Sequence, residues 1–151
     1  MTQSINASPF LMYDEGCKEA ARFYVSVFPD GRIVSGENEP GVSFEVGGQR
    51  FDAFDGGSHF TFTEGFSVQV RCETQEEVDH FWDRLVEGGG EHSQCGWLKD
   101  RWGLSWQIVP NALYRLMTDP DPERAKRATD AMLQMRKLDI AALEAAADGR
   151  A

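Results

Sequence analysis

The chain has 151 residues, of which 25 are acidic and 15 basic, giving a formal net charge of −10. A chain of this length forms one ordinary domain and buries about two-thirds of its unfolded surface without needing metals or disulfides. The negative charge repels nucleic acid and anionic membranes, and no apolar run reaches the roughly eighteen residues of a membrane span. The first ten residues lack the basic and apolar segments of a signal peptide. We therefore expect a soluble, cytoplasmic protein that binds neither nucleic acid nor membranes.

The cysteines give no sign of a structural crosslink. Cys17, Cys72 and Cys95 are odd in number, widely spaced and free of any CxxC pattern. A disulfide framework or a zinc ribbon needs paired or closely spaced cysteines. The spacing therefore predicts three separate reduced thiols.

The first half of the chain reads as a strand, a helix and three further strands. Apolar residues at helical spacing predict a helix over 19–28, which ends at Pro29-Asp30-Gly31. Strand-like runs occupy 9–14, 32–34, 42–46 and 49–54, with Gly47-Gly48 as a hairpin turn. This order predicts a βαβββ module over residues 5–54.

The second half repeats that order at an offset of 58 residues. EVDHFWDRLV at 77–86 resembles EAARFYVSVF at 19–28 and predicts a second helix, with Thr74 as its N-cap. Strands are predicted over 67–72, 91–95, 97–100 and 104–109. The sequence thus predicts a second βαβββ module over 65–110, joined to the first by a polar, glycine-containing linker over 55–64.

The segment after Pro110 changes to helix. Helices are predicted over 111–118, over 123–137 and after Asp139, forming a helical extension over 111–151 of a single domain. Ala128, Met132 and Met135 form an apolar stripe on the middle helix. An amphipathic face does not identify what it packs against, so the stripe covers either its own domain or the partner in a homodimer.

Three segments carry a resemblance to a known superfamily: AARFYVSVFPDGRIVSG, ETQEEVDHFWDRL and the final hairpin CGWLKDRWGLSWQIVP. The paired modules resemble the vicinal oxygen chelate superfamily, which includes glyoxalase I, bleomycin-resistance proteins and extradiol dioxygenases. The chain is most similar to its PhnB-like branch, whose family is named 3-demethylubiquinone-9 3-methyltransferase. The resemblance implies an α+β fold in which two βαβββ modules form a curved mixed sheet around a cleft, in a homodimeric protein.

That family name is not a guide to the reaction. The superfamily's scaffold carries isomerases, dioxygenases, thiol transferases and non-catalytic binding proteins, so the fold leaves the function open. The chain lacks the glycine-rich strand-to-helix motif of a Rossmann-type cofactor site. We therefore expect neither methyl transfer nor a bound cofactor.

The resemblance also allows the metal site to be tested. Metal-using members place one ligand on the first and on the last strand of each module, facing the cleft. If Phe10 and Met12 point to the helix, the first strand offers only Leu11 and its neighbours, and its repeat partner offers Gln69. Neither strand then supplies a histidine or glutamate to the cleft.

The last strands offer little more. In the first module, Phe51 and Ala53 are expected to face the cleft, although a slip of one residue would expose Asp52 instead. In the second module, Gln107 occupies the position where metal-using relatives carry glutamate. One neutral amide cannot replace the usual three protein ligands of a catalytic divalent metal, so we predict that no metal is bound.

The resulting hypothesis is a protein that binds a small organic molecule in the cleft. The polar residues expected to orient this ligand are Gln69, Ser105 and Gln107. The apolar contacts are expected from Leu11, Phe51, Trp97 and Trp102. Trp106 alternates with Gln107 and is expected in the core.

The alternative is an enzyme, either a lyase, an isomerase or a transferase. It would use a metal held by Gln107 and ligands in another register, or metal-free chemistry at His59 or Cys95. A histidine titrates near physiological pH, and Lys99 or Arg101 would activate a neighbouring thiol. The competing interpretations are a solvated loop histidine and an inert strand cysteine.

Overall fold

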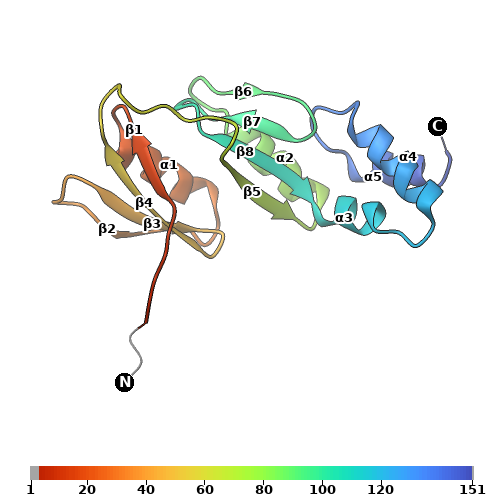
Figure 1. Cartoon of the computed structure of the whole chain (residues 1–151), viewed down its shortest axis with the longest axis horizontal. Helices are drawn as coiled ribbons and strands as arrows, with labels where there is room; N and C mark the ends of the chain where they lie inside the picture. Colours follow the sequence, from red (N-terminus) through yellow and green to blue (C-terminus); the bar gives the residue numbers. More distant parts are fainter. Residues whose placement is uncertain (1–3, 151) are drawn as a thin grey trace. The chain divides into compact units, whose positions relative to one another are not determined.

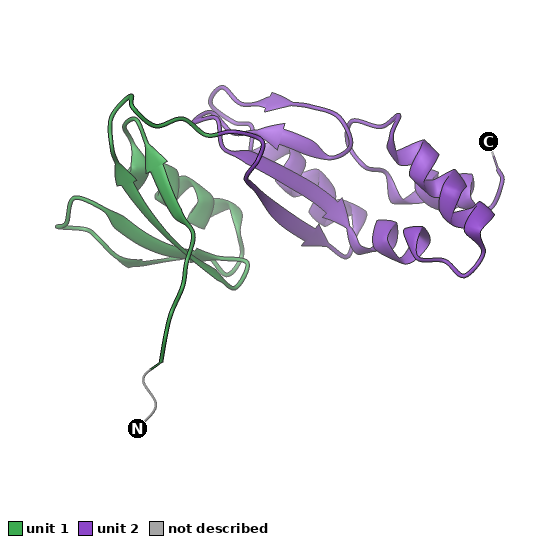
Figure 2. Cartoon of the chain, viewed as in Figure 1, with its two compact units in different colours: residues 1–62 green, residues 63–151 purple. Residues whose placement is uncertain are grey.

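The computed structural model describes residues 4–150, which form two compact units divided between Phe62 and Thr63 (Figure 2). The boundary between the units lies within the linker expected over 55–64. The α+β class, the two βαβββ modules and the C-terminal helices are confirmed. Among the described residues, no helix is long and apolar enough to cross a membrane.

The first unit contains one four-stranded sheet with a helix against one face (Figure 1). Its elements are β1 (Phe10–Tyr13), α1 (Cys17–Val27), β2 (Arg32–Ser35), β3 (Val42–Val46) and β4 (Gln49–Asp55). The strand order is β1-β4-β3-β2, with β1 parallel to β4 and the other pairs antiparallel. Gly47 and Gly48 both have positive φ, which a tight two-residue hairpin requires, so the expected turn is confirmed.

Aromatic side chains fill the space between this sheet and α1. Tyr13 on β1 and Tyr24 on α1 share a hydrogen bond between their hydroxyl groups at 2.9 Å. Phe44 on β3 lies beside Tyr24 and stacks on Phe51 of β4, with ring centres 5.4 Å apart. These contacts fix which residues of each strand face the helix.

The side-chain directions expected for β1 and β4 are wrong by one residue. Leu11 and Phe51 are each 3% exposed and lie on the side that packs against α1, whereas Phe10 is 61% exposed. Because Phe10 and Asp52 are paired in the register, Asp52 also lies on the face opposite the helix. We call that face of each sheet, opposite its helix, the open face.

The second unit repeats the arrangement with β5 (Ser67–Cys72), α2 (Gln75–Arg84), β6 (Glu91–His92), β7 (Trp97–Lys99) and β8 (Ser105–Pro110). The strand order β5-β8-β7-β6 has β5 parallel to β8. Thr74 caps α2 by accepting a hydrogen bond from the backbone N–H of Glu77, as expected. Val70, Trp106 and Ile108 are buried, so the expected side-chain directions of this unit are confirmed.

The hairpin between β7 and β8 is built around the carboxylate of Asp100. One oxygen accepts hydrogen bonds from the backbone N–H groups of Trp102 and Leu104, each at 3.0 Å. The other accepts from Nε1 of Trp106 at 2.9 Å. The Trp106 indole therefore belongs to the core, and its only donor is satisfied by a buried charge.

The C-terminal helices are α3 (Asn111–Met117), α4 (Pro122–Met132) and α5 (Ile140–Ala147). They pack within their own unit, where Ala128, Leu138 and Leu143 share an apolar cluster with Val109 of β8. The helix expected to reach 137 ends at Met132. The freed backbone carbonyls of Met135 and Arg136 accept hydrogen bonds from the N–H groups of Cys95 and Gly96, each at 2.8 Å.

Candidate functional site

The open face of the second sheet carries two rows of side chains that the strand register places side by side. Ser67, Ser105, Lys99 and Glu91 form one row across β5, β8, β7 and β6. Gln69, Gln107 and Trp97 form the next row. Residues two apart on a strand share a face, so both rows lie on the side away from α2.

Two of the predicted polar residues are already hydrogen-bonded within the protein. Gln69 donates from Nε2 to the Tyr114 hydroxyl on α3 at 2.5 Å and accepts from Nε of Arg71 at 3.1 Å. Gln107 donates from Nε2 to the Ser67 hydroxyl at 2.9 Å. Both ends of Gln69 are occupied, whereas no described residue donates to the Oε1 atom of Gln107.

Ser105 is the one buried polar side chain of the described residues that lacks a hydrogen-bond partner. It is 1% exposed, and its Oγ has no hydrogen-bond partner among the described residues. A buried hydroxyl without a partner costs about 1 to 3 kcal/mol, so most such groups in proteins are satisfied. Ser105 also lines a pocket, and because its Oγ is enclosed, a ligand in that pocket would reach the hydroxyl only after a small movement of the neighbouring atoms.

That pocket has a volume of about 510 Å³ and lies at the β6 edge of the sheet. Trp97, Lys99 and Ser105 border it from the sheet, and Cys95 borders it from the turn before β7. Pockets for small molecules usually span about 300 to 1,000 Å³ and combine apolar walls with a few polar groups. The pocket lies nearer to the edge strand than expected, so Gln69 and Gln107 lie in the adjoining row rather than in its wall.

Among the neighbouring residues of this unit, Trp102 lies outside the pocket wall, whereas His92 and Lys99 border the pocket. Trp102 occupies the turn after β7, with the guanidinium of Arg101 4.2 Å from its ring centre. His92 stacks on Trp82 and donates from Nε2 to the Trp82 carbonyl oxygen at 2.8 Å. Lys99 forms an ion pair with Glu64 at 2.5 Å, so its charge is neutralised by Glu64 rather than directed at the Cys95 thiol.

The cysteines separate into two buried thiols and one accessible thiol. Burial, with Asp55 nearby, raises the pKa of Cys17 to about 11, and burial raises the pKa of Cys72 to about 12. Both thiols are therefore protonated and unreactive at neutral pH. Cys95 is partly exposed and adopts φ 58°, a left-handed conformation that is costly for a residue other than glycine. His59 is exposed in the segment that follows β4 in the first unit.

The open face of the first sheet presents a carboxylate where phenylalanine or alanine was expected. The hydroxyl groups of Ser43 and Ser8 donate to Asp52, and Arg50 forms an ion pair with it at 3.4 Å. These hydrogen bonds, led by that of Ser43, hold the pKa of the Asp52 carboxyl below its ordinary value. Asp52 is thus a satisfied structural group among the exposed rings of Phe10 and Phe54.

The residues at the superfamily's ligand positions do not fit a divalent metal. Asp52 is engaged by two hydroxyl groups and an arginine, and Gln69 and Gln107 are neutral amides bonded within their own unit. Divalent catalytic metals need about three nitrogen, sulfur or carboxylate ligands. Across residues 4–150, no three side chains of the histidine, cysteine, aspartate and glutamate types come together as a metal site.

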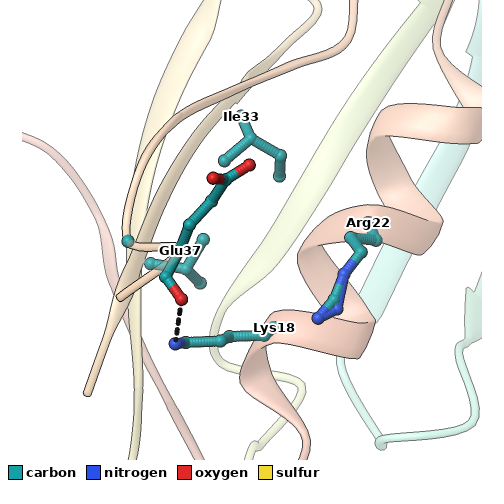
Figure 3. A pocket seen from close by; sticks show the side chains of 6 residues that line it. Lys18, Arg22, Ile33 and Glu37 are labelled. Carbon is teal, nitrogen blue, oxygen red and sulfur yellow. Dashed lines mark hydrogen bonds between the residues drawn. The ribbon is translucent and has the colours of Figure 1, made fainter. Parts of the chain in front are cut away.

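A second pocket, of about 300 Å³, lies in the first unit between α1 and the β2–β3 segment (Figure 3). Lys18 and Arg22 border it from the helix, and Ile33 and Val42 border it from the strands. The ammonium group of Lys18 reaches the backbone carbonyl of Glu37 at 3.4 Å. No expectation from the sequence covered this pocket, although the four-residue spacing of Lys18 and Arg22 places both on one helix face.

Comparison with protein families matches residues 5–109 to 3-demethylubiquinone-9 3-methyltransferase. The chain belongs to this family. The match ends at β8, so the helices α3, α4 and α5 lie outside it. A comparison with curated proteins found no match.

Solved structures support the same assignment, to the PhnB-like branch of the vicinal oxygen chelate superfamily. A putative 3-demethylubiquinone-9 3-methyltransferase, PhnB protein, from Bacillus cereus is 32% identical with a TM-score of 0.62, and the match covers 70% of this chain and 99% of that one. A glyoxalase/bleomycin resistance protein from Albidiferax ferrireducens is 14% identical, with a TM-score of 0.55 and coverages of 72% and 99%. The fosfomycin resistance protein FosX from Listeria monocytogenes is 17% identical, with a TM-score of 0.53 and coverages of 73% and 95%. The last two show the fold alone.

Proposed function

We propose that this family member binds a small organic molecule, without a bound metal, in the pocket on the second sheet. The unpartnered Ser105 hydroxyl carries the proposal, because burial without a hydrogen bond is a cost that a ligand would remove. Trp97 offers an aromatic wall beside it, and Gln107 offers a free carbonyl oxygen in the next row. The expected ligand thus combines a flat or apolar part with a group that bonds to a hydroxyl.

The test compares two serines that face each other across β5 and β8. We expect Ser105→Ala to leave the free protein unchanged or more stable by about 1 kcal/mol, because it removes an unsatisfied group. Ser67→Ala is the control, since Ser67 accepts a hydrogen bond from Gln107 and its loss should destabilise the unit slightly. Urea unfolding of both variants measures the difference, and a clear loss of stability in Ser105→Ala would assign the hydroxyl to the core instead.

Ligand and metal content are measured on the protein as purified, without chelators. We expect native mass spectrometry to detect a bound small molecule, or a thermal-shift panel of aromatic compounds to raise the melting temperature. Either effect should weaken in Ser105→Ala. A divalent ion at one equivalent by elemental analysis would overturn the metal-free part of the proposal.

A metal-free enzyme using Cys95 is the second candidate function. Its support is the left-handed backbone that holds Cys95 beside the pocket, because strained residues concentrate at functional sites. Alkylation by iodoacetamide tests it, since Cys17 and Cys72 are buried and should not compete. Alkylation of Cys95 at the rate of free cysteine would count against this candidate, and a much faster rate would favour it.

We also propose that the protein is a cytoplasmic homodimer. The superfamily resemblance and the acidic, span-free chain support this proposal. The apolar stripe of the C-terminal helices does not, since Ala128 is buried in its own unit and Met132 and Met135 pack against the same apolar cluster. A monomeric mass by light scattering at tens of micromolar protein would refute the dimer.

A further inference from the structure

The pocket of the first unit has an unusual distribution of charge. At least ten of the fifteen lysine and arginine side chains form an ion pair with a carboxylate, in a chain that holds 25 acidic residues. Lys18 and Arg22 form none with any residue of 4–150. In a chain with so many carboxylates, two neighbouring cations without an acidic partner call for an explanation.

Helix stability does not supply that explanation. Lys18 and Arg22 are four residues apart on α1, and like charges at this spacing destabilise a helix by about 0.2 to 0.5 kcal/mol. Lys18 donates only one long hydrogen bond, to the Glu37 carbonyl oxygen. Its remaining protons and the guanidinium of Arg22 are left for another partner. In Figure 3 the Glu37 carboxylate points away from Lys18, toward Ile33.

The opposite wall of the pocket is mainly apolar and also includes Glu37. Ile33 and the buried Val42 face the two cations, and Gly36 completes the wall. Gly36 has φ 118°, and a Cβ atom there would lie 2.4 Å from the carbonyl oxygen of Gly41, so only glycine fits. The segment that closes the pocket is thereby held against β3. The pocket presents two cations on one side, and branched aliphatic groups with the Glu37 side chain beside Ile33 on the other.

We propose that this pocket binds a short-chain aliphatic carboxylate. The planar guanidinium of Arg22 matches a carboxylate in two parallel hydrogen bonds, and Lys18 adds a second cation. The alkyl chain packs on Ile33 and Val42. The volume of about 300 Å³ is ample for a carboxylate with a short alkyl chain. This site belongs to the first unit and does not depend on the function proposed for the second.

Calorimetric titration with sodium butyrate tests the site. The double variant Lys18→Gln/Arg22→Gln should bind butyrate at least about tenfold more weakly, because charge-assisted hydrogen bonds contribute roughly 1.5 to 3 kcal/mol. Arg32→Gln is the matched control, since it removes one positive charge from the same unit at a residue outside the pocket. Equal weakening in Arg32→Gln would overturn the proposal by showing a general charge effect.

Three further ligands define the chemical class. Acetate lacks the apolar chain, butanol lacks the charge, and both should bind clearly more weakly than butyrate. Inorganic phosphate carries charge without an aliphatic part, and tighter binding of phosphate than of butyrate would overturn the assignment to a carboxylate. Ser105→Ala should leave butyrate binding unchanged, because Ser105 lies in the other unit. Either of the two proposed sites can therefore be refuted without refuting the other. Butyrate that binds no protein form at millimolar concentration would also refute the site.

Discussion

The two units repeat one topology, but they differ in how the polar groups on their open faces are satisfied. On the first sheet, Asp52 is surrounded by donors from Ser8, Ser43 and Arg50. On the second, Ser105 is more deeply buried and has no partner among the described residues. A saturated carboxylate stabilises the fold, whereas an unsaturated hydroxyl leaves a bond to be made. The comparison therefore separates a structural cluster from a candidate binding group.

The closing hairpins show a related difference. In the first unit, Asp30 follows α1 and accepts hydrogen bonds from the N–H groups of Gly47 and Gly48, each at 2.9 Å, on the protein surface. In the second, Asp100 lies inside its own hairpin, is 3% exposed and accepts three hydrogen bonds. An aspartate holds the turn in both units, but only one of them is part of the core.

The largest loss of stability is expected when the hydrogen bonds of the β7–β8 hairpin are removed. Asp100→Ala should lower the free energy of unfolding by about 4 kcal/mol, because three donors lose a charged acceptor and one of them is a buried indole. All four tryptophans lie in the second unit, so urea unfolding followed by tryptophan fluorescence reports on that unit alone. Asp30→Ala is the control for the surface turn and should cost about 1 kcal/mol, measured by far-ultraviolet circular dichroism because the first unit holds no tryptophan.

The relative size of the two effects decides the comparison. If Asp100→Ala cost no more than Asp30→Ala, the buried carboxylate would contribute no more than a surface turn contact. Asp100→Asn sharpens the result, because it keeps the size of the side chain and removes its charge.

The next effect tests the corrected direction of β1. Leu11→Ala should cost about 3 kcal/mol, since it removes a buried side chain between the sheet and α1. Phe10→Ala removes more atoms but should cost less than 1 kcal/mol, because its ring is largely exposed. Unfolding followed by far-ultraviolet circular dichroism measures both. A larger loss of unfolding free energy in Phe10→Ala than in Leu11→Ala would support the direction expected from the sequence, in which Phe10 faces the helix.

The sequence predicted correctly which side chains of β5 face the helix, but it failed for β1, the first strand of the other unit. The difference has a physical reason. SVQVRC alternates polar and apolar residues, so Val70 and Gln69 could be assigned to opposite faces. FLMY is apolar at all four positions of β1, so alternation carries no information there. Contacts that sequence does not display decided the direction, above all the Tyr13 to Tyr24 hydrogen bond. The metal-ligand analysis of the first module rested on that strand and inherited its error.

The sequence predicted which side chains of the candidate site lie on the open face, but not which of them lack a hydrogen-bond partner. Ser105, Gln107 and Trp97 lie on the open face as expected, because strand periodicity fixes that face. Which of them lacks a partner depends on atoms far apart in sequence, such as the Tyr114 hydroxyl that occupies Gln69. The early end of α4 also depends on contacts between residues far apart in sequence. The backbone carbonyls of Met135 and Arg136 accept hydrogen bonds from the turn before β7. Helical spacing continued through those residues, and tertiary hydrogen bonds ended the helix.

The smallest expected effect concerns pH and the first open face. The folded-state pKa of Asp52 lies below the ordinary carboxyl value of 3.8, mainly because Ser43 and Ser8 donate to its charged form. Its stabilising contribution is therefore complete above the unfolded pKa and is lost as pH falls through the lower, folded pKa. Asp52→Asn should reduce the stability of the first unit at pH 7, and the reduction should shrink as the pH falls through the folded-state pKa of Asp52, so the acid dependence becomes shallower. Urea unfolding by circular dichroism at several pH values measures this, with the exposed Asp14→Asn as the control. Equal slopes in the wild type and Asp52→Asn would mean that the serine hydroxyls do not favour the carboxylate, and the contrast between the saturated and unsaturated open faces would then be lost.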